Sequence, residues 1–159
     1  MSPRNANRLA GSDGFTLIEI LMVMVIIGLL AALALPAFLG QRAKATDATA
    51  KVDARTAETA MEVYRTDHDD SFACGTSAQC AGALHGIDSS VPAGGVTVEG
   101  EDGSGQADDD AFRVTTIGGD HRSFWIARRP GRRSRGCALN GAPSAGGCRV
   151  SGGDTTGSW

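Results

Sequence analysis

The sequence predicts an α+β fold in which a long amino-terminal helix packs on a small antiparallel β-sheet, followed by a glycine-rich carboxy-terminal loop. Three observations lead to this prediction. A charge-free apolar run at residues 20–39 continues without a spacer into a helical pattern that extends to about residue 67. Short alternating runs typical of strands replace that pattern after residue 69. All but four of the 22 glycines also lie beyond residue 70, so the second half of the chain is rich in turns.

The composition limits both the size of the core and the class of protein. The 159 residues suffice for one domain of ordinary size, and the net charge of −3 does not indicate a general nucleic-acid binder. Outside the apolar run the chain is polar, rich in alanine and poor in large side chains. Such a chain buries only a small core, so we expect a covalent crosslink or a partner to stabilise the fold.

The first element is a helix of membrane length. Ile20 to Leu39 are twenty residues without a charge, which at 1.5 Å per residue make roughly 30 Å of helix, the thickness of a bilayer's hydrocarbon core. Arg4 and Arg8 precede it, and cations favour the cytoplasmic side. The helix should therefore cross the cytoplasmic membrane once, with everything after Leu39 outside.

An ordinary secretory signal is the main competitor for this element. It would also begin with cations and an apolar run, and Ala32-Leu33-Ala34 resembles a general signal peptidase site. Three features oppose this alternative: the run is longer than the usual signal, it contains Glu19, and a helical pattern resumes directly after Phe38.

Glu19 is the chemically informative residue of the segment. A carboxylate in a membrane costs about 2.5–3.5 kcal/mol on insertion scales, so a functional reason is the default. A nearby cation would offset that cost, yet the segment holds no lysine or arginine. Cleavage after Gly14 would create an α-amino group at Phe15, four residues before Glu19.

The stretch GFTLIE, followed by a charge-free run containing Pro36, resembles the amino terminus of type IV pilins and type II secretion pseudopilins. The resemblance covers about residues 14–64 and is most specific at residues 14–19. It implies a pilin-like fold, cleavage between Gly14 and Phe15 by a prepilin peptidase, and N-methylation of Phe15. The family's conserved acid corresponds to Glu19 and its helix-breaking proline to Pro36, both of which act in assembly. The implied domains are a leader at 1–14, a polymerisation helix at 15–39, its amphipathic continuation at 40–67 and a head at 68–159.

The resemblance also implies a function. The chain would be a structural subunit of a type IV pilus-like filament, with motility or cell adhesion among its uses and with no enzymatic activity of its own. The alternative within the family is a pseudopilin of a type II secretion or competence system. Implied partners are copies of itself in a helical filament, minor pilins, the prepilin peptidase, and an inner-membrane assembly platform with its ATPase motor. The subunit would wait in the cytoplasmic membrane with its head outside and then enter an extracellular or cell-envelope filament.

The helix is expected to continue outside the membrane. Residues 40–67 contain no proline and no glycine after Gly40. Small or apolar residues recur there at three- and four-residue steps, and we expect this face to pack on the sheet. They are Ala45, Ala48, Val52, Thr56, Ala60 and Val63.

Three strands are expected after the helix, at residues 95–99, 111–117 and 122–128, joined by turns rich in glycine and aspartate. Strands in sequence with short turns favour an antiparallel meander packed by one face on the helix. The expected core residues are Phe112, Val114, Ile117, Phe124 and Ile126.

Four cysteines can supply this covalent crosslink as disulfides. Neither the spacing from Cys74 to Cys80 nor that from Cys137 to Cys148 is the CxxC of a zinc or redox site. In an exported chain two local disulfides are favoured, although three pairings are possible. Free buried thiols would instead fit a cytosolic protein.

Two charged stretches are candidate ligand sites. The acidic loop at residues 100–110 is a candidate for calcium, but it lacks the EF-hand spacing, and no cofactor is otherwise expected. The basic run at 128–136 is a candidate anion-binding loop, for DNA phosphates or an acidic surface of a neighbouring subunit, with a solvated loop as the alternative. Its arginines are Arg128, Arg129, Arg132, Arg133 and Arg135.

The sequence offers no catalytic constellation. His68, His85 and His121 are scattered, without a metalloprotease, hydrolase or phosphate-loop motif. An enzyme is therefore the weakest class. A soluble binding protein released by signal peptidase after Ala34 is the remaining alternative outside the filament proteins.

Overall fold

The computed structural model describes residues 14–103, 105–142, 147–150 and 156–159. The side chains of residues 36, 37 and 39 are not described. The chain divides into two compact units, Met1–Phe38 and Leu39–Trp159. The fold is α+β, as the sequence predicts.

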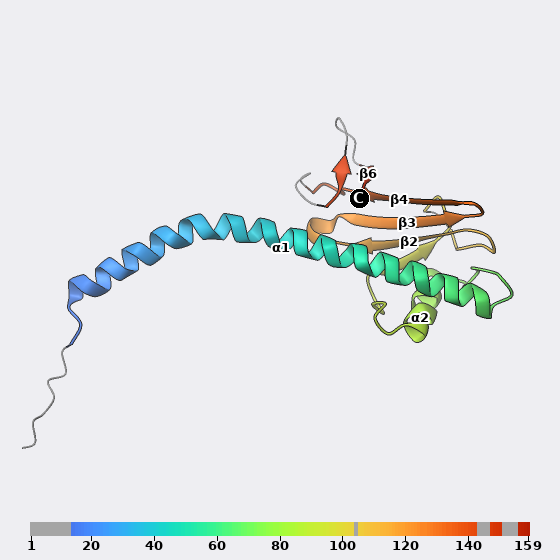
Figure 1. Ribbon diagram of the computed structural model, residues 1–159, viewed down its shortest axis with the longest axis horizontal. Coiled ribbons are helices and arrows are strands. Elements are labelled where there is room, and N and C mark those ends of the chain that lie inside the picture. Colours follow the sequence, from blue (N-terminus) through green and yellow to red (C-terminus); the bar gives the residue numbers. More distant parts are fainter. Residues whose placement is uncertain (1–13, 104, 143–146, 151–155) are drawn as a thin grey trace, which may run out of the picture. The chain divides into compact units, whose positions relative to one another are not determined.

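Helix α1, Leu17–Asp67, is a single helix of 51 residues that contributes to both units (Figure 1). The helix continues past residue 39, in agreement with the helical pattern in the sequence. The helix also includes position 36. Helical residues lie on both sides of position 36, and the kink and assembly role expected of Pro36 stay predictions.

The face of α1 that packs on the sheet differs from the predicted one. Of the six residues expected to be buried, only Ala60 is, whereas Val52 and Val63 are 56% and 41% exposed. The buried face is instead formed by Asp47, Ala50, Ala54, Ala57, Glu58, Ala60, Met61 and Tyr64. The prediction failed because alanine occurs on both faces, and because the true inner face holds two carboxylates whose cationic partners lie far away in the sequence.

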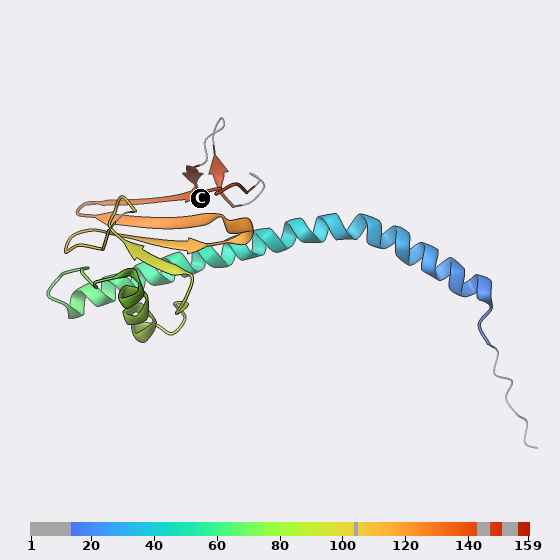
Figure 2. The same cartoon turned by 180° about the vertical axis from the view of Figure 1, so that it is seen from behind.

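The sheet has six strands in the described residues, three more than the sequence predicts. Their bounds are β1 Val96–Glu99, β2 Phe112–Ile117, β3 Ser123–Arg129, β4 Arg132–Ala138, β5 Arg149–Val150 and β6 Thr156–Ser158. The spatial order is β1-β2-β3-β4-β6-β5 and every neighbouring pair is antiparallel. Seen from both sides, the second half of α1 runs along one face of this sheet (Figures 1 and 2).

The core lies between α1 and the inner face of the sheet. Phe112, Val114, Phe124 and Ile126 are buried as expected. Ile117 is 53% exposed, which corrects the prediction. Alternate residues of β2 face inward, so the inward position near its end belongs to Thr116, whose hydroxyl donates to the Ala50 carbonyl at 2.7 Å.

The basic run predicted as a loop is a β-hairpin. Arg129 pairs with Arg132 across the turn formed by Pro130 and Gly131, and Gly131 has a φ of +69°, which glycine adopts without strain. The prediction of a loop was wrong because a run of arginines has no strand-like pattern of its own. The run becomes a strand through its pairing with β3 and its acidic partners, which the sequence does not reveal.

A second helix, α2, Ser77–Ile87, was not predicted from the sequence. Thr76 and Gln79 form a reciprocal capping box at its start. The TSAQ pattern was the available signal, and its Thr-x-x-Gln spacing should have indicated a helix start.

Two local disulfides join Cys74 to Cys80 and Cys137 to Cys148, the pairing that the spacing favours. The first ties the segment after α1 to α2, and the second joins β4 to the residue before β5. The predicted carboxy-terminal loop is thus partly ordered as short strands, β5 and β6, held against β4.

Candidate processing and assembly segment

The predicted cleavage site lies just before α1. Gly14, Phe15 and Thr16 are not helical, and the helix begins at Leu17. The Phe15 side chain is 79% exposed, and a Cβ atom added to Gly14 would meet nothing within 4 Å. Among the described residues, no side chain therefore covers the bond between Gly14 and Phe15. The predicted leader, residues 1–14, lies outside the described residues except for Gly14.

Thr16 caps the helix that carries Glu19. The Glu19 N–H donates to the Thr16 hydroxyl at 3.3 Å and to the Thr16 carbonyl at 3.1 Å. Thr16 thus satisfies a backbone donor that the first helical turn leaves open. The sequence analysis did not select Thr16, although Thr-x-x-Glu is the capping-box spacing.

Glu19 occupies the first turn of α1, where the helix dipole favours a negative charge. Its side chain is exposed, and within the described part of the chain it takes part in no ion pair. No lysine or arginine follows it until Arg42. The carboxylate is therefore available to a cation from outside this segment.

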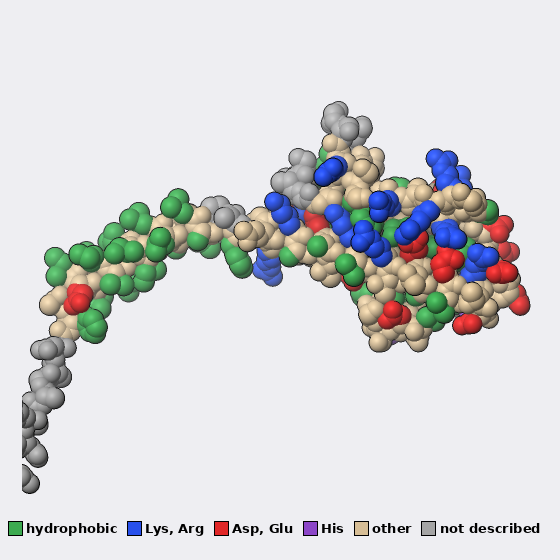
Figure 3. Space-filling view, in the orientation of Figure 1, with side chains coloured by type: hydrophobic (Ala, Val, Ile, Leu, Met, Phe, Trp, Pro, Cys, Tyr) green, Lys and Arg blue, Asp and Glu red, His purple; other side chains and the backbone are tan. Residues whose placement is uncertain are grey.

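The surface of the segment after Glu19 is apolar on all sides. Large side chains from Leu17 to Phe38 are about half exposed or more, and Figure 3 shows hydrophobic side chains, with backbone between them, over most of the visible surface of the described part of this segment. Among the described helices α1 is long and apolar enough to cross a membrane, judged by length and composition, a test that a signal sequence also passes. A bare apolar surface of this extent requires lipid or other protein around it.

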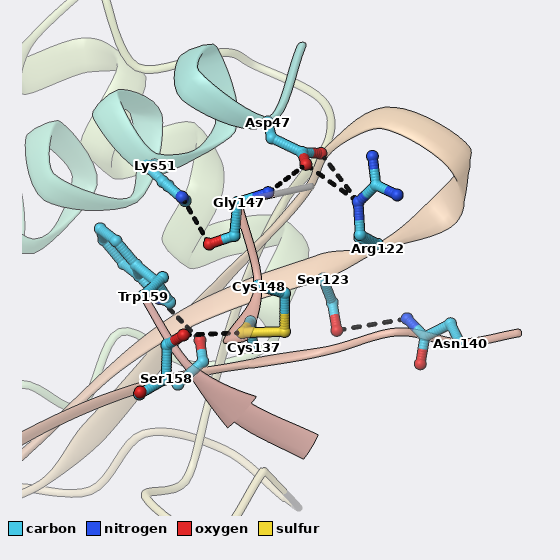
Figure 4. Close-up of a disulfide and its surroundings, with 11 residues drawn as sticks. Asp47, Lys51, Arg122, Ser123, Cys137, Asn140, Gly147, Cys148, Ser158 and Trp159 are labelled. Carbon is cyan, nitrogen blue, oxygen red and sulfur yellow. Dashed lines mark hydrogen bonds and ion pairs between the residues drawn. A yellow bond between two sulfur atoms is a disulfide. The ribbon is translucent and has the colours of Figure 1, made fainter. Parts of the chain in front are cut away.

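A buried ion pair fixes the head to α1 (Figure 4). Arg122, with a side chain 0% exposed, donates from Nε to Asp47 Oδ2 at 2.9 Å and to Oδ1 at 3.2 Å. The backbone N–H groups of Gly119 and Gly147 donate to the same carboxylate at 2.9 and 3.0 Å. One helix residue thereby holds both the β2–β3 turn and the segment before β5. Neither charged residue was selected from the sequence, which contains no signal that joins them.

Lys51, one turn further along α1, continues this arrangement. Its ammonium donates to the Gly147 carbonyl at 2.7 Å and lies 5.7 Å from the centre of the Trp159 ring. Burial lowers the Lys51 pKa, as do the nearby guanidinium groups of Arg55, Arg122 and Arg149, while Asp47 opposes the shift.

Most arginines of the predicted anion-binding run have acidic partners within the head. Arg128 pairs with Glu62 at 2.9 Å, Arg129 with Glu101, and Arg133 with Glu58. Arg135 lies 5.7 Å from the centre of the Trp159 ring, and Arg132 is exposed on the hairpin. Three of the five arginines thus hold the hairpin to α1 and to the acidic loop, which leaves less positive charge for an external anion.

The carboxylates of the acidic loop also accept hydrogen bonds within the head. Asp108 accepts from the backbone N–H groups of Asp110 and Ala111, and Asp109 accepts from the Ser71 hydroxyl at 2.6 Å. In the described residues no group of three or more histidine, cysteine, aspartate or glutamate side chains could hold a metal ion. The suggestion of calcium therefore has no geometric support from the described residues.

The three histidines lie in structural parts of the head, at a helix end, in α2 and in a turn. His68 stacks on Tyr64 with ring centres 3.7 Å apart, and His85 Nδ1 lies 2.7 Å from the Val91 carbonyl oxygen. His121 adopts a φ of +62° in the turn before β3.

The amino-terminal segment matches a known family over a short part of the chain. Residues 10–35 match the family described as the prokaryotic N-terminal methylation motif, and the segment confirms the resemblance to prepilin-type proteins. The chain thus carries a prepilin-type amino terminus on an α+β fold.

Among curated proteins the chain is similar to those named type II secretion system core protein G. It is 44% identical over 55 residues to the protein from Escherichia coli (strain K12), which covers 35% of this chain and 38% of the relative. The identity to the Aeromonas hydrophila protein is 39% over 56 residues, covering 35% and 39%. The Pseudomonas aeruginosa protein is 42% identical over 56 residues, with the same coverage of 35% and 39%. The matched part thus spans less than two fifths of each relative's length, and no solved structure matches the chain.

Proposed function

We propose that this chain is a pseudopilin, a structural subunit that polymerises through α1 into a cell-envelope filament of a secretion system. The observation that carries the proposal is the exposed GFTLIE segment at the start of an apolar helix that precedes a small folded head. The similarity to type II secretion core proteins favours this function over a pilus subunit, which was the first expectation from the sequence.

Assembly in this proposal depends on two reactions done to the chain. A prepilin peptidase cleaves after Gly14, and the new amino terminus at Phe15 is methylated. Glu19 then meets the Phe15 ammonium of a neighbouring subunit, which offsets the cost of holding a carboxylate in an apolar environment and sets the axial register. The chain itself performs no reaction. Its proposed partners are further copies, minor subunits, and a membrane platform with its ATPase.

The mass of the mature protein tests the processing step. Cleavage after Gly14 leaves 145 residues, the 159 of the chain less the 14 of the leader, with one added methyl group. Release by signal peptidase after Ala34 would leave 125 residues and remove Glu19 with the signal. A mature chain beginning at Leu35 would therefore refute the proposal.

Substitution of Glu19 tests the assembly step. Glu19→Gln retains the shape of the side chain and removes its charge, so the variant should be cleaved normally but should lose filament assembly. Glu99→Gln, at a partly exposed carboxylate on the head strand β1, is the matched control and should assemble. Normal filaments with normal subunit spacing in Glu19→Gln would show that the carboxylate does not set the register.

A further inference from the structure

Four cations of the head gather near Trp159. Lys51 Nζ and the guanidinium carbons of Arg55 and Arg135 lie 5.7, 5.2 and 5.7 Å from the centre of the Trp159 ring. Arg149 is on β5, opposite the residue that precedes Trp159. We call the four cations and the indole the Trp159 cluster. Its members come from α1, β4, β5 and the residue after β6, so only the tertiary structure brings them together.

The indole of this cluster is held in place by the fold. Its Nε1–H donates to the Gly136 carbonyl at 2.7 Å, and its ring packs edge-on against Phe124, with ring centres 6.1 Å apart. Phe124 is buried and Trp159 is half-buried, so the indole is anchored in the core and also reaches the surface. The face of an indole attracts cations, which explains why they approach the ring. The ring carries no net charge, however, so it does not neutralise them.

The ion pairs between α1 and the sheet stop at this cluster. Glu58 of α1 pairs with Arg133 of β4. The neighbouring position one turn earlier on α1 is Arg55, and the next residue on the same face of β4 is Arg135. An acid at either position would continue the series of ion pairs, but both residues are arginines. Like charges therefore meet at the Trp159 ring, where their mutual repulsion is not balanced by an acid of the helix or the strand.

The cluster keeps an excess of positive charge at the surface. Its three arginines are exposed, and no acidic group of the described residues forms an ion pair with them. Burial lowers the pKa of Lys51, the charges of nearby arginines lower it further, and Asp47 opposes the shift. The Asp47 carboxylate is already occupied by Arg122 and by two backbone N–H groups. Figure 3 shows lysine and arginine side chains gathered on the face of the head where α1 and β4 lie. An anion from outside can neutralise this charge.

We propose that the Trp159 cluster is a binding site for a phosphate group. A phosphomonoester carries about two negative charges at pH 7 and three acceptor oxygens, so it can accept from several cations at once. A single carboxylate would leave most of the positive charge unbalanced. Guanidinium groups, three of the four cations here, also match the geometry of phosphate oxygens. Inorganic phosphate and the headgroup of a phosphomonoester lipid both present this chemistry. The inference does not depend on the proposed function, because every residue of the site belongs to the head.

Titration of the full chain in non-ionic detergent tests the site. Trp125→Phe leaves Trp159 as the sole tryptophan, so the fluorescence reports on the site. At constant ionic strength, added inorganic phosphate should change this fluorescence until it saturates. Arg135→Gln should weaken the binding about tenfold, because it removes a charged donor to the phosphate. Arg132→Gln is the matched control. Arg132 is also exposed on β4 but is not a member of the cluster, so its loss of one charge should leave the binding unchanged.

A second titration identifies the source of the phosphate. Micelles containing phosphatidic acid offer a phosphomonoester headgroup, and micelles with the same fraction of phosphatidylcholine offer a zwitterionic one. A response to inorganic phosphate alone assigns the site to free phosphate. A response to phosphatidic acid, but not to inorganic phosphate or phosphatidylcholine, assigns it to a lipid headgroup. Both results support the inference when Arg135→Gln weakens the response and Arg132→Gln does not.

Thermal melting gives an independent measurement. A ligand that binds only the folded head raises its Tm, so saturating phosphate should raise the Tm of wild type and of Arg132→Gln, and should raise that of Arg55→Gln and Arg135→Gln less. Arg55 and Arg135 are exposed, so both variants should stay folded without phosphate. If neither source of phosphate changes the Trp159 fluorescence or the Tm, or if Arg132→Gln weakens binding as much as Arg135→Gln, the cluster is not a phosphate site. That result would overturn the inference and leave the proposed function untouched.

Discussion

Removing the carboxylate of Asp47 should destabilise the head severely. Asp47→Ala leaves the guanidinium of Arg122 buried without the acceptor that now lies 2.9 Å from its Nε, while Asp120, 54% exposed and 3.4 Å from Nη1, remains as a weaker ionic partner. Breaking a buried ion pair by removing one partner costs about 3–5 kcal/mol, because the remaining charge stays in a poorly solvated place. The backbone N–H groups of Gly119 and Gly147 also lose their acceptor, but their loops are partly exposed and water can replace it.

This loss is large compared with the roughly 5–15 kcal/mol that keeps a domain folded. For a head of this size, a loss near 4 kcal/mol lowers Tm by roughly 15 °C. Both tryptophans, Trp125 and Trp159, lie in the head, so tryptophan fluorescence of the full chain in detergent follows its melting without a signal from the apolar segment.

Asp53→Ala is the matched control, since it removes another carboxylate from the same helix, six residues later. Asp53 is half-buried, and burial raises its pKa, so its charge is poorly stabilised and its removal should change Tm by only a few degrees. Adding Arg122→Met to Asp47→Ala should recover part of the loss, because the buried charge that has lost Asp47 disappears. If Asp47→Ala melts within the range of the Asp53→Ala control, the ion pair does not hold the head together.

Three further predictions concern the helix start, the pH dependence and a disulfide. Thr16→Ala should loosen the first turn of α1 by about 1 kcal/mol, seen as faster hydrogen exchange of the Glu19 amide in micelles, whereas Thr16→Ser should not. Asp53→Asn should stabilise the head slightly at pH 7. That gain should disappear as the pH falls through the raised pKa towards the ordinary value of 3.8, where the native carboxyl is also neutral; a gain unchanged at low pH would contradict the cause. Replacing Cys137 and Cys148 by serine should cost about 2–3 kcal/mol, measured as a lower Tm than wild type without reductant, and reductant should lower the Tm of this variant further only by the contribution of the Cys74–Cys80 disulfide.

The sequence predicted the elements better than it predicted their contacts. The charge-free run, the helical pattern after it and the alternating strands at residues 96–99, 112–117 and 123–129 each have a strong local period, and all are present in the structure. The arginine-rich β4 has no such period. It is a strand because its neighbour β3 pairs with it and because Arg133 finds Glu58 on α1.

The face of α1 shows why a local pattern can mislead. Alanine, threonine and valine at three- and four-residue steps predicted a buried stripe, but most of those positions face away from the sheet. The buried face includes Asp47 and Glu58, which become acceptable in the interior only through Arg122 and Arg133. These pairs join residues 75 positions apart, so no window of the sequence contains both partners.

The sequence by itself determined the amino-terminal part of this protein. The N-terminal methylation motif, the apolar run and the isolated acid are recognised by their order along the chain. A membrane-length helix satisfies its own backbone hydrogen bonds without help from the rest of the fold. Only the tertiary structure decided which side of α1 the head covers. That choice depends on ion pairs and strand neighbours that are distant in sequence, and it is what leaves Val52 and Val63 exposed.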